Sequence, residues 1–260
     1  QDSLIFGDAV LSFRDSVLLK AIQERFYWIK NDPELWLSWH VRLGRYEELI
    51  LSTLREHGVP EIFIGLFIWE SRLNSDAKSR AKAVGIPQFI PFTGQAYGLR
   101  INSIVDERLN PYISLPAAAK HLVDLKDSLG SWLLAIAAYN CGEPQLKRRI
   151  AKQGTRDVFL LEKPTETNGY VYLVPATMFW YQKRYELYPW LEFVPQYEEF
   201  PEATIREMKL SKPTSLEDIA ESCGLSLKEF KRVNRHFLVQ RVPKGTYRVV
   251  IPEPESLDQD

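Results

Sequence analysis

Apolar residues recur at helical spacing along the first three quarters of the chain. Two early segments, 17–28 and 45–57, carry them at intervals of three and four residues, as amphipathic helices do. Residues 61–73 are apolar on nearly every face, which is typical of a helix buried in a core. Further helical patterns begin near positions 114, 132, 143 and 168. No alternating strand pattern is found between 11 and 186, so this part is predicted to be almost wholly α-helical.

The pattern changes after a proline-containing stretch. Residues 188–203 hold three prolines among acidic and aromatic residues, which is typical of an extended linker. Two strands are expected beyond it, at 204–210 and 247–251, with two short helices between them at 216–221 and 227–233. The sequence therefore predicts a mainly α protein with three parts: a helical domain over 1–187 with its core at 42–186, a linker over 188–203, and a small βααβ domain over 204–260.

Composition and charge limit the function classes. The 260 residues are 45% hydrophobic and 26% charged, as in ordinary globular proteins. The 33 Lys and Arg residues balance 34 Asp and Glu residues, so no nucleic-acid partner is expected. The longest uncharged apolar runs, Ile62–Trp69 and Trp132–Tyr139, are far shorter than the roughly 20 residues of a membrane-spanning helix. The four histidines and two cysteines show no metal-ligand spacing, so no metal is expected.

One carboxyl group stands out from this background. Glu70 closes a run of eight apolar residues at the C-terminal end of the predicted buried helix. Burial and the negative end of the helix dipole both disfavour the carboxylate, so both are expected to raise its pKa. A carboxyl group that stays protonated near neutral pH can act as a general acid on a glycosidic oxygen. Taken alone, this position more often belongs to a glutamate that ends a helix and points into water.

The residues that follow Glu70 change this interpretation. Glu70-Ser71 is followed by Gly85-Ile86-Pro87-Gln88 and by Ala138-Tyr139-Asn140. These resemble the three ordered motifs of the lytic transglycosylases with a goose-type-lysozyme-like (SLT) domain: Glu-Ser, Gly-Leu-Met-Gln or Gly-Leu-Trp-Gln, and Ala-Tyr-Asn. Residues 164–171 resemble a fourth motif, Glu-Thr-x-x-Tyr-Val, of the D-type branch of that family. The resemblance extends over 42–150 and implies a lysozyme-like, all-helical catalytic domain.

The C-terminal segment resembles a LysM module, which binds glycans that contain N-acetylglucosamine. The residues that carry this resemblance are Ser215-Leu216, Ile219-Ala220, Gly224-Leu225-Ser226-Leu227, Asn234 and Ile251-Pro252. Transglycosylases of the D type carry such modules at this end. The usual Gly-Asp before the first helix is replaced by Pro213-Thr214, so sugar binding by this module stays open.

The resemblance implies that Glu70 is the single acid and base that cleaves the β-1,4 bond between N-acetylmuramic acid and N-acetylglucosamine. The product would be a 1,6-anhydro-muramyl end, formed with help from the N-acetyl group of the substrate. Roles in binding substrate or orienting Glu70 are implied for six residues: Ser79, Gln88, Tyr139, Asn140, Glu166 and Tyr170. No metal or organic cofactor is implied. The expected protein is a monomer that acts on peptidoglycan glycan strands, exported to the periplasm or cell envelope, with or without a lipid anchor.

Three departures from the family pattern leave alternatives open. Pro87 replaces a Met or Trp, Lys82 stands where Gly is frequent, and Ser75 stands where Pro is usual. The smaller side chain at position 87 suggests an altered preference for modified, de-N-acetylated glycan. A lysozyme-type hydrolase is an alternative, and it would need Asp76 or Asp106 to position a water molecule. A non-catalytic glycan-binding protein is another, but the presence of Glu70 argues against it.

Overall fold

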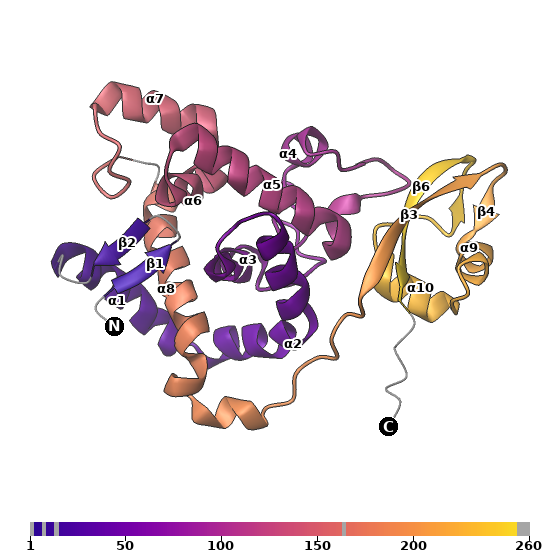
Figure 1. The fold of residues 1–260 in the computed structure, drawn as a ribbon, viewed down its shortest axis with the longest axis horizontal. Coiled ribbons are helices and arrows are strands. Elements are labelled where there is room, and N and C mark those ends of the chain that lie inside the picture. The colour runs from indigo at the N-terminus through magenta and orange to yellow at the C-terminus, as the bar shows by residue number, and fades with distance from the viewer. Residues whose placement is uncertain (1–2, 7–8, 13–15, 163–164, 254–260) are drawn as a thin grey trace. The chain divides into compact units, whose positions relative to one another are not determined.

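The structure is a computed structural model that describes residues 3–6, 9–12, 16–162 and 165–253 (Figure 1). The chain forms two compact units. The first joins Gln1–Leu73 with Ala118–Tyr197, and the second joins Asn74–Ala117 with Glu198–Asp260. Residues 74–117, which hold the second motif, therefore fold with the C-terminal segment. The division expected from the sequence, with boundaries near 188 and 203, stays a prediction.

The first unit is built mainly from helices. Its elements are α1 (Ser16–Lys30), α2 (Pro33–Glu56), η1 (Glu61–Phe63), α3 (Ile64–Ser71), α5 (Pro111–Leu129) from Ala118 onward, α6 (Trp132–Cys141), α7 (Glu143–Gln153), α8 (Thr165–Leu187) and η3 (Pro189–Phe193). The predicted helical character is confirmed. The hydrophobic pattern did not predict the small antiparallel pair of strands at the N-terminus, β1 (Ser3–Phe6) and β2 (Ala9–Ser12).

Local sequence signals set several helix boundaries. The helix α2 begins where the Asp32 side chain accepts a hydrogen bond from the Leu35 N–H and Pro33 occupies the first helical position. From there α2 runs without interruption to Glu56, so the helix expected over 45–57 begins a dozen residues earlier. The helix α7 ends at Gly154, which adopts the left-handed conformation that favours glycine.

The helix α3 is buried and packs against α8. Four apolar residues of α3 and the preceding Phe63 are at most 1% exposed, which confirms the predicted core helix. The four are Ile64, Leu66, Phe67 and Ile68. A Cβ atom on Gly65 would lie 2.5 Å from Met178 Cγ and 2.9 Å from Met178 Cα. Only glycine permits this separation, so Gly65 allows the two helices to approach closely.

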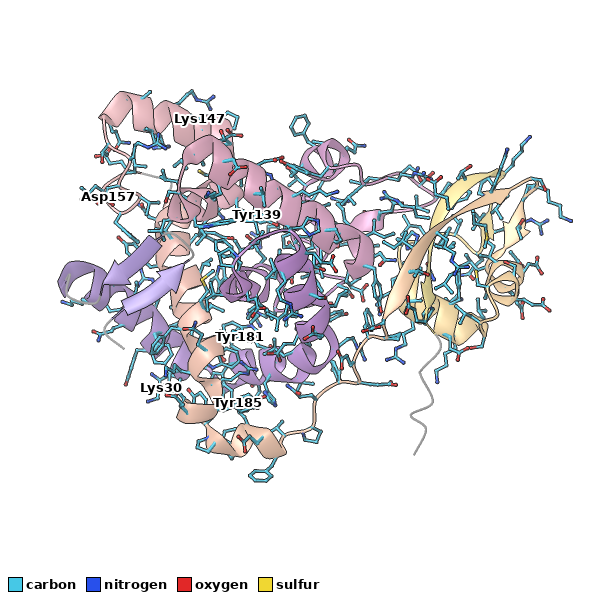
Figure 2. The ribbon with its side chains drawn as sticks, viewed as in Figure 1. Lys30, Tyr139, Lys147, Asp157, Tyr181 and Tyr185 are labelled. Carbon is cyan, nitrogen blue, oxygen red and sulfur yellow. The ribbon has the colours of Figure 1, made fainter. Side chains whose placement is uncertain are left out.

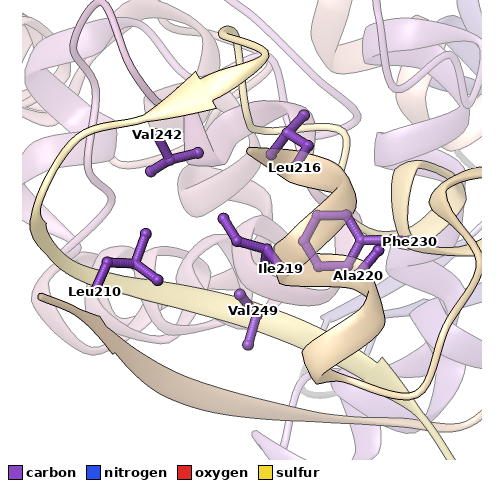
Figure 3. Close-up of a cluster of buried hydrophobic side chains, with 7 residues drawn as sticks. All are labelled: Leu210, Leu216, Ile219, Ala220, Phe230, Val242 and Val249. Carbon is purple, nitrogen blue, oxygen red and sulfur yellow. The ribbon is translucent and has the colours of Figure 1, made fainter. Parts of the chain in front are cut away.

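The C-terminal part of the second unit contains the predicted βααβ elements, together with two short strands that the sequence pattern did not predict. The strand β3 (Ala203–Leu210) pairs antiparallel with β6 (Gly245–Pro252), and between them in sequence lie β4 (Thr214–Ser215), α9 (Leu216–Ser222), α10 (Leu227–Val233) and β5 (Arg241–Val242). Residues 203–253 are called the C-terminal module below. Its own apolar core consists of Leu210, Leu216, Ile219, Ala220, Phe230, Val242 and Val249 (Figure 3). The LysM resemblance of this module stays a prediction.

Residues 74–117 form the other part of the second unit. They consist mostly of loops, together with α4 (Pro91–Ala96), η2 (Glu107–Leu109) and the first turns of α5. Lys82 has a φ of +62°, in the left-handed region that favours glycine. This conformation explains why glycine is frequent at the matching family position. Among the described residues, no helix combines the length and apolar character that crossing a bilayer requires.

Replacing Gly65 by Ala is expected to lower the free energy of unfolding by about 1–3 kcal/mol, the usual cost of overpacking a core. Urea unfolding followed by circular dichroism would measure it. Gly169→Ala in α8 is the matched control, because among the described residues a Cβ atom there meets only Leu173 Cδ1, at 3.9 Å. A Gly65→Ala protein as stable as the wild type would show that α3 and α8 separate without cost.

Replacing Lys82 by Gly is expected to raise the free energy of unfolding by about 1 kcal/mol, because it relieves a left-handed conformation that costs non-glycine residues about 1–2 kcal/mol. Lys78→Gly is the control, and it should be destabilising because it only adds freedom to the unfolded chain. Thermal unfolding of both variants beside the wild type tests the pair. Equal losses of stability in the two variants would contradict the strain at Lys82.

Candidate active site

Glu70 and Tyr170 meet where α3 ends. Glu70 is the next-to-last residue of α3, and Tyr170 lies in the second turn of α8. The Tyr170 hydroxyl donates a hydrogen bond of 2.5 Å to Glu70 Oε1. Burial raises the pKa of Tyr170 well above its usual value, and the charge of Glu70 raises it further. The phenol therefore keeps its proton and acts as a donor that fixes one oxygen of the carboxyl group.

The backbone turns sharply directly after Glu70-Ser71. Arg72 and Leu73 have φ values of +54° and +56°, which are unfavourable for residues other than glycine. The Leu73 side chain is fully buried, and Arg42 Nη1 donates a hydrogen bond of 2.9 Å to the Arg72 carbonyl oxygen. These contacts hold the strained turn in place. Backbone strain of this kind is concentrated at functional sites.

The third motif lies at the end of α6, and its Tyr139 is labelled in Figure 2. Burial raises the pKa of Tyr139 well above its usual value, and the charge of Glu70 adds to the effect. The ring of His121 lies beside that of Tyr139, with centroids 5.4 Å apart. Burial lowers the pKa of His121 to about 4, so its imidazole is neutral near pH 7. Two uncharged rings therefore lie side by side at this motif.

Thr167 is a site residue to which the sequence analysis gave no role. It is 1% exposed, and its hydroxyl donates a hydrogen bond of 2.8 Å to Asn140 Oδ1. Asn140 is thereby tied to the first turn of α8. Thr167 matches the Thr of the fourth motif, so this motif could have identified Thr167 as a residue of the site. Glu166 precedes it in α8, but its side chain lies outside the described residues.

Ser79 and Gln88 lie in one loop of the second unit. Gln88 has a φ of +51°, and its Nε2 donates hydrogen bonds of 2.8 Å to the Gly85 carbonyl and 3.3 Å to the Ala77 carbonyl. Ser79 Oγ accepts a bond of 3.1 Å from the Ala83 N–H. A Cβ atom on Gly85 would lie 1.9 Å from the Arg108 carbonyl oxygen, so the first position of the second motif requires glycine.

The two aspartates that were candidates for the second carboxylate of a hydrolase both form ion pairs with arginines. Asp106 Oδ1 and Oδ2 accept hydrogen bonds of 2.9 Å and 2.7 Å from Nε and Nη2 of Arg108, and both side chains are largely buried. Asp76 forms an ion pair with Arg235. Each aspartate therefore has a structural partner. Across the described part of the chain, no three His, Cys, Asp or Glu residues gather in a way that would hold a metal ion.

Three comparisons relate the chain to known proteins. Residues 50–161 match the family model described as Transglycosylase SLT domain. Over 201 residues the chain is 30% identical to Membrane-bound lytic murein transglycosylase D of Escherichia coli K12, covering 75% of this chain and 43% of that relative. Over 104 residues it is 38% identical to Peptidoglycan transglycosylase gp16 of Escherichia phage T7, covering 39% of this chain and 8% of the relative.

A solved structure of the lytic transglycosylase Slt from Pseudomonas aeruginosa also matches. It has a TM-score of 0.42 and 20% identity, and the match covers 53% of this chain and 24% of that one. The chain spans less than half the length of the E. coli relative that it matches. Glu70 and the second and third motifs all lie within the matched range 50–161. The resemblance to the SLT transglycosylases seen in the sequence is confirmed, and residues 50–161 form a transglycosylase SLT domain.

Proposed function

We propose that this protein is a lytic transglycosylase that cleaves the glycan strands of peptidoglycan. The observation that carries the proposal is the Glu70 carboxyl group at the end of a buried helix, with one oxygen held by the Tyr170 hydroxyl at 2.5 Å. The site lies in a matched SLT domain, and the names of two relatives include murein or peptidoglycan transglycosylase. These names support the choice of substrate class.

In the proposed mechanism Glu70 acts first as an acid and then as a base. It donates a proton to the oxygen of the β-1,4 bond between N-acetylmuramic acid and N-acetylglucosamine, and that bond breaks. The N-acetyl group of the substrate stabilises the oxocarbenium-like carbon. Glu70 then takes the proton of the muramyl 6-hydroxyl, whose oxygen bonds to that carbon and closes the 1,6-anhydro ring. The Tyr170 hydroxyl holds Oε1 of the same carboxyl group.

The remaining motif residues are proposed to bind the glycan. Asn140 is suited to this role because Thr167 fixes its side chain through Oδ1. Tyr139 keeps its proton and so offers a hydroxyl donor. Ser79, Gln88 and Glu166 are assigned to substrate contacts through the family resemblance.

The transglycosylase reaction is favoured over hydrolysis of the same bond. A hydrolase of lysozyme type needs a second carboxylate that binds the attacking water or the substrate. Asp76 and Asp106 were the candidates, and each is engaged with an arginine. The Glu70–Tyr170 contact likewise supports an enzyme over a non-catalytic glycan-binding protein. Because of Pro87, we also propose as a variant that the enzyme prefers de-N-acetylated glycan strands. Comparing cleavage rates on N-acetylated and de-N-acetylated murein tests this variant.

The proposed place of action follows from the substrate. Peptidoglycan lies in the cell envelope, so we place the protein there, acting as a monomer on glycan strands. The name of the E. coli relative describes that protein as membrane-bound. No metal or organic cofactor takes part in the proposed reaction, since proton transfer by one carboxyl group completes both steps.

Replacing Glu70 by Gln is expected to lower the turnover of purified murein by at least 100-fold, since general acid–base catalysis contributes about 10²–10⁴-fold. Mass spectrometry of the digest should show anhydro-muropeptides from the wild type. Glu61→Gln is the control, because Glu61 is a surface residue paired with Arg55. Reducing muropeptides from the wild type would indicate a hydrolase, and near-normal turnover by Glu70→Gln would remove Glu70 from the mechanism.

Replacing Tyr170 by Phe keeps the buried ring but removes the donor to Glu70. Turnover is expected to fall by about 10- to 100-fold, because misplacing a catalytic group by about 1 Å costs on that order. Tyr172→Phe, on the same helix, should leave turnover unchanged. Circular dichroism would check that both variants are folded, and initial rates on soluble glycan would compare them. Equal rates for the two variants would show that Glu70 needs no fixation by Tyr170.

A further inference from the structure

The C-terminal module is joined to residues 104–106 by backbone pairing. The Asp106 N–H donates to the His236 carbonyl at 2.9 Å, and the Leu238 N–H donates to the Ile104 carbonyl at 2.8 Å. Val105 forms a β-bridge with Phe237 between these two bonds. Ile104 also packs against the apolar core of the module. Segments more than 120 residues apart in the sequence are thus held in register.

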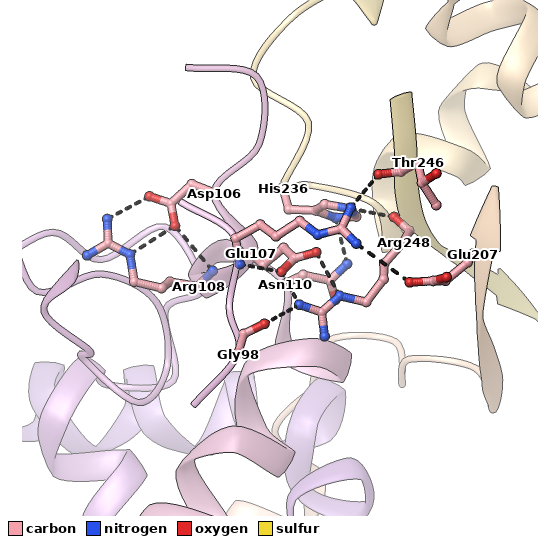
Figure 4. Close-up of polar contacts among 10 residues, drawn as sticks. Gly98, Asp106, Glu107, Arg108, Asn110, Glu207, His236, Thr246 and Arg248 are labelled. Carbon is pink, nitrogen blue, oxygen red and sulfur yellow. Dashed lines mark hydrogen bonds and ion pairs between the residues drawn. The ribbon is translucent and has the colours of Figure 1, made fainter. Parts of the chain in front are cut away.

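A buried side-chain network lies beside this pairing (Figure 4). Asn110 is fully buried, and its Nδ2 donates hydrogen bonds of 2.9 Å to the Val233 carbonyl and to His236 Nδ1. Its Oδ1 accepts a bond of 3.1 Å from the Tyr112 N–H. Burial lowers the pKa of His236 to about 4, so the ring is neutral and its Nε2 donates to the Arg248 carbonyl at 3.0 Å. A fully satisfied polar network of this kind rigidifies the structure around it.

An ion pair completes the junction. The Glu107 side chain is 1% exposed and accepts hydrogen bonds from Nε of Arg248 at 2.8 Å and from its Nη2. It also accepts a bond of 2.6 Å from the Arg100 N–H, and Arg248 Nη2 donates to the Gly98 carbonyl at 2.7 Å. Removing the arginine would leave a buried carboxylate without its ionic partner, which is costly. Arg248 is therefore the point at which the junction is most easily loosened.

Asp106 connects the C-terminal module to the loop that holds the second motif. Its N–H is held by the module, while its carboxylate holds the guanidinium of Arg108. Arg108 Nη1 in turn donates hydrogen bonds of 2.9 Å to the carbonyls of Lys82 and Phe89. These two carbonyls flank Gln88 and its strained backbone. The ion pair between Asp76 and Arg235 ties the start of the same loop to the module.

We propose that the C-terminal module acts as a brace that holds the second-motif loop in its glycan-binding shape. This inference rests on the proposed function, in which Gln88 contacts the glycan. Arg248, through its partner Glu107, and Asn110 are then positioning residues that act through the adjacent Asp106 and Arg108. The module thus sets the affinity of the enzyme for any glycan, whether or not the module itself binds sugar.

Full-length Arg248→Met tests the brace, and Arg241→Met is the matched control. Arg241 is an exposed arginine of the same module whose Nη2 donates to the Pro213 carbonyl at 3.4 Å, within the module itself. Kinetics on short soluble glycan should show KM raised about tenfold by Arg248→Met with kcat changed less than about threefold, as expected when binding but not chemistry is weakened. Amide hydrogen exchange over 77–89 should become faster. Arg241→Met should match the wild type in both measurements.

Three results would overturn the inference. A fall in kcat at unchanged KM would mean only that less active protein is present. A defect confined to insoluble murein would mean that the module is a tethered sugar binder. Unchanged exchange over 77–89 in a folded Arg248→Met protein would mean that the loop needs no brace. If Arg248→Met fails to fold, Arg235→Met takes its place, because that pair is partly exposed.

The exchange measurement also separates the two proposals. A wild-type protein that cleaves no glycan would defeat the proposed function. Faster exchange over 77–89 in Arg248→Met would still support the brace, because that measurement needs no substrate. Slow exchange in the variant together with normal murein cleavage by the wild type would defeat the brace alone.

Discussion

The close packing of α3 against α8 is the constraint on which the candidate site depends. The two helices approach so closely at Gly65 and Met178 that there is no room for a Cβ atom between them. Glu70 and its donor Tyr170 come from these same two helices. A hydrogen bond tolerates only a few tenths of an ångström in length, so the spacing of the helices decides whether the phenol reaches the carboxyl group. A glycine one and a half turns from Glu70 thus contributes to the geometry of its hydrogen bond with Tyr170.

The rings near Glu70 share one electrostatic property. Tyr139 and Tyr170 keep their protons because burial and the charge of Glu70 raise their pKa values. The neighbouring His121 is neutral because burial lowers its pKa to about 4. None of these three groups therefore changes charge between about pH 5 and pH 9. The carboxyl group of Glu70 is therefore surrounded by rings that stay uncharged over that range.

The sequence could predict what local patterns encode. Helical periodicity gave the helices, and the ordered motifs gave Glu70, Tyr139 and Tyr170, which the structure places in one unit. Other features arise from contacts between distant segments and leave no local pattern. The pairing of Ile104 with Leu238 is one example, and the bond from Thr167 to Asn140 is another. Asp76 and Asp106 looked available for catalysis because nothing in the sequence revealed that arginines bind them.

The interleaved order of the two units has a consequence for biosynthesis. The first unit needs residues up to 197, and the second unit closes only when its strand β6 pairs with β3. Residues 74–117 are synthesised well before their partners Arg235, His236 and Arg248, which lie more than 100 residues later in the chain. Pairing of segments so far apart is slow because a long loop must close first. The loop of the second motif must therefore wait until these later residues have been synthesised, and a nascent chain halted before residue 236 would expose it without support.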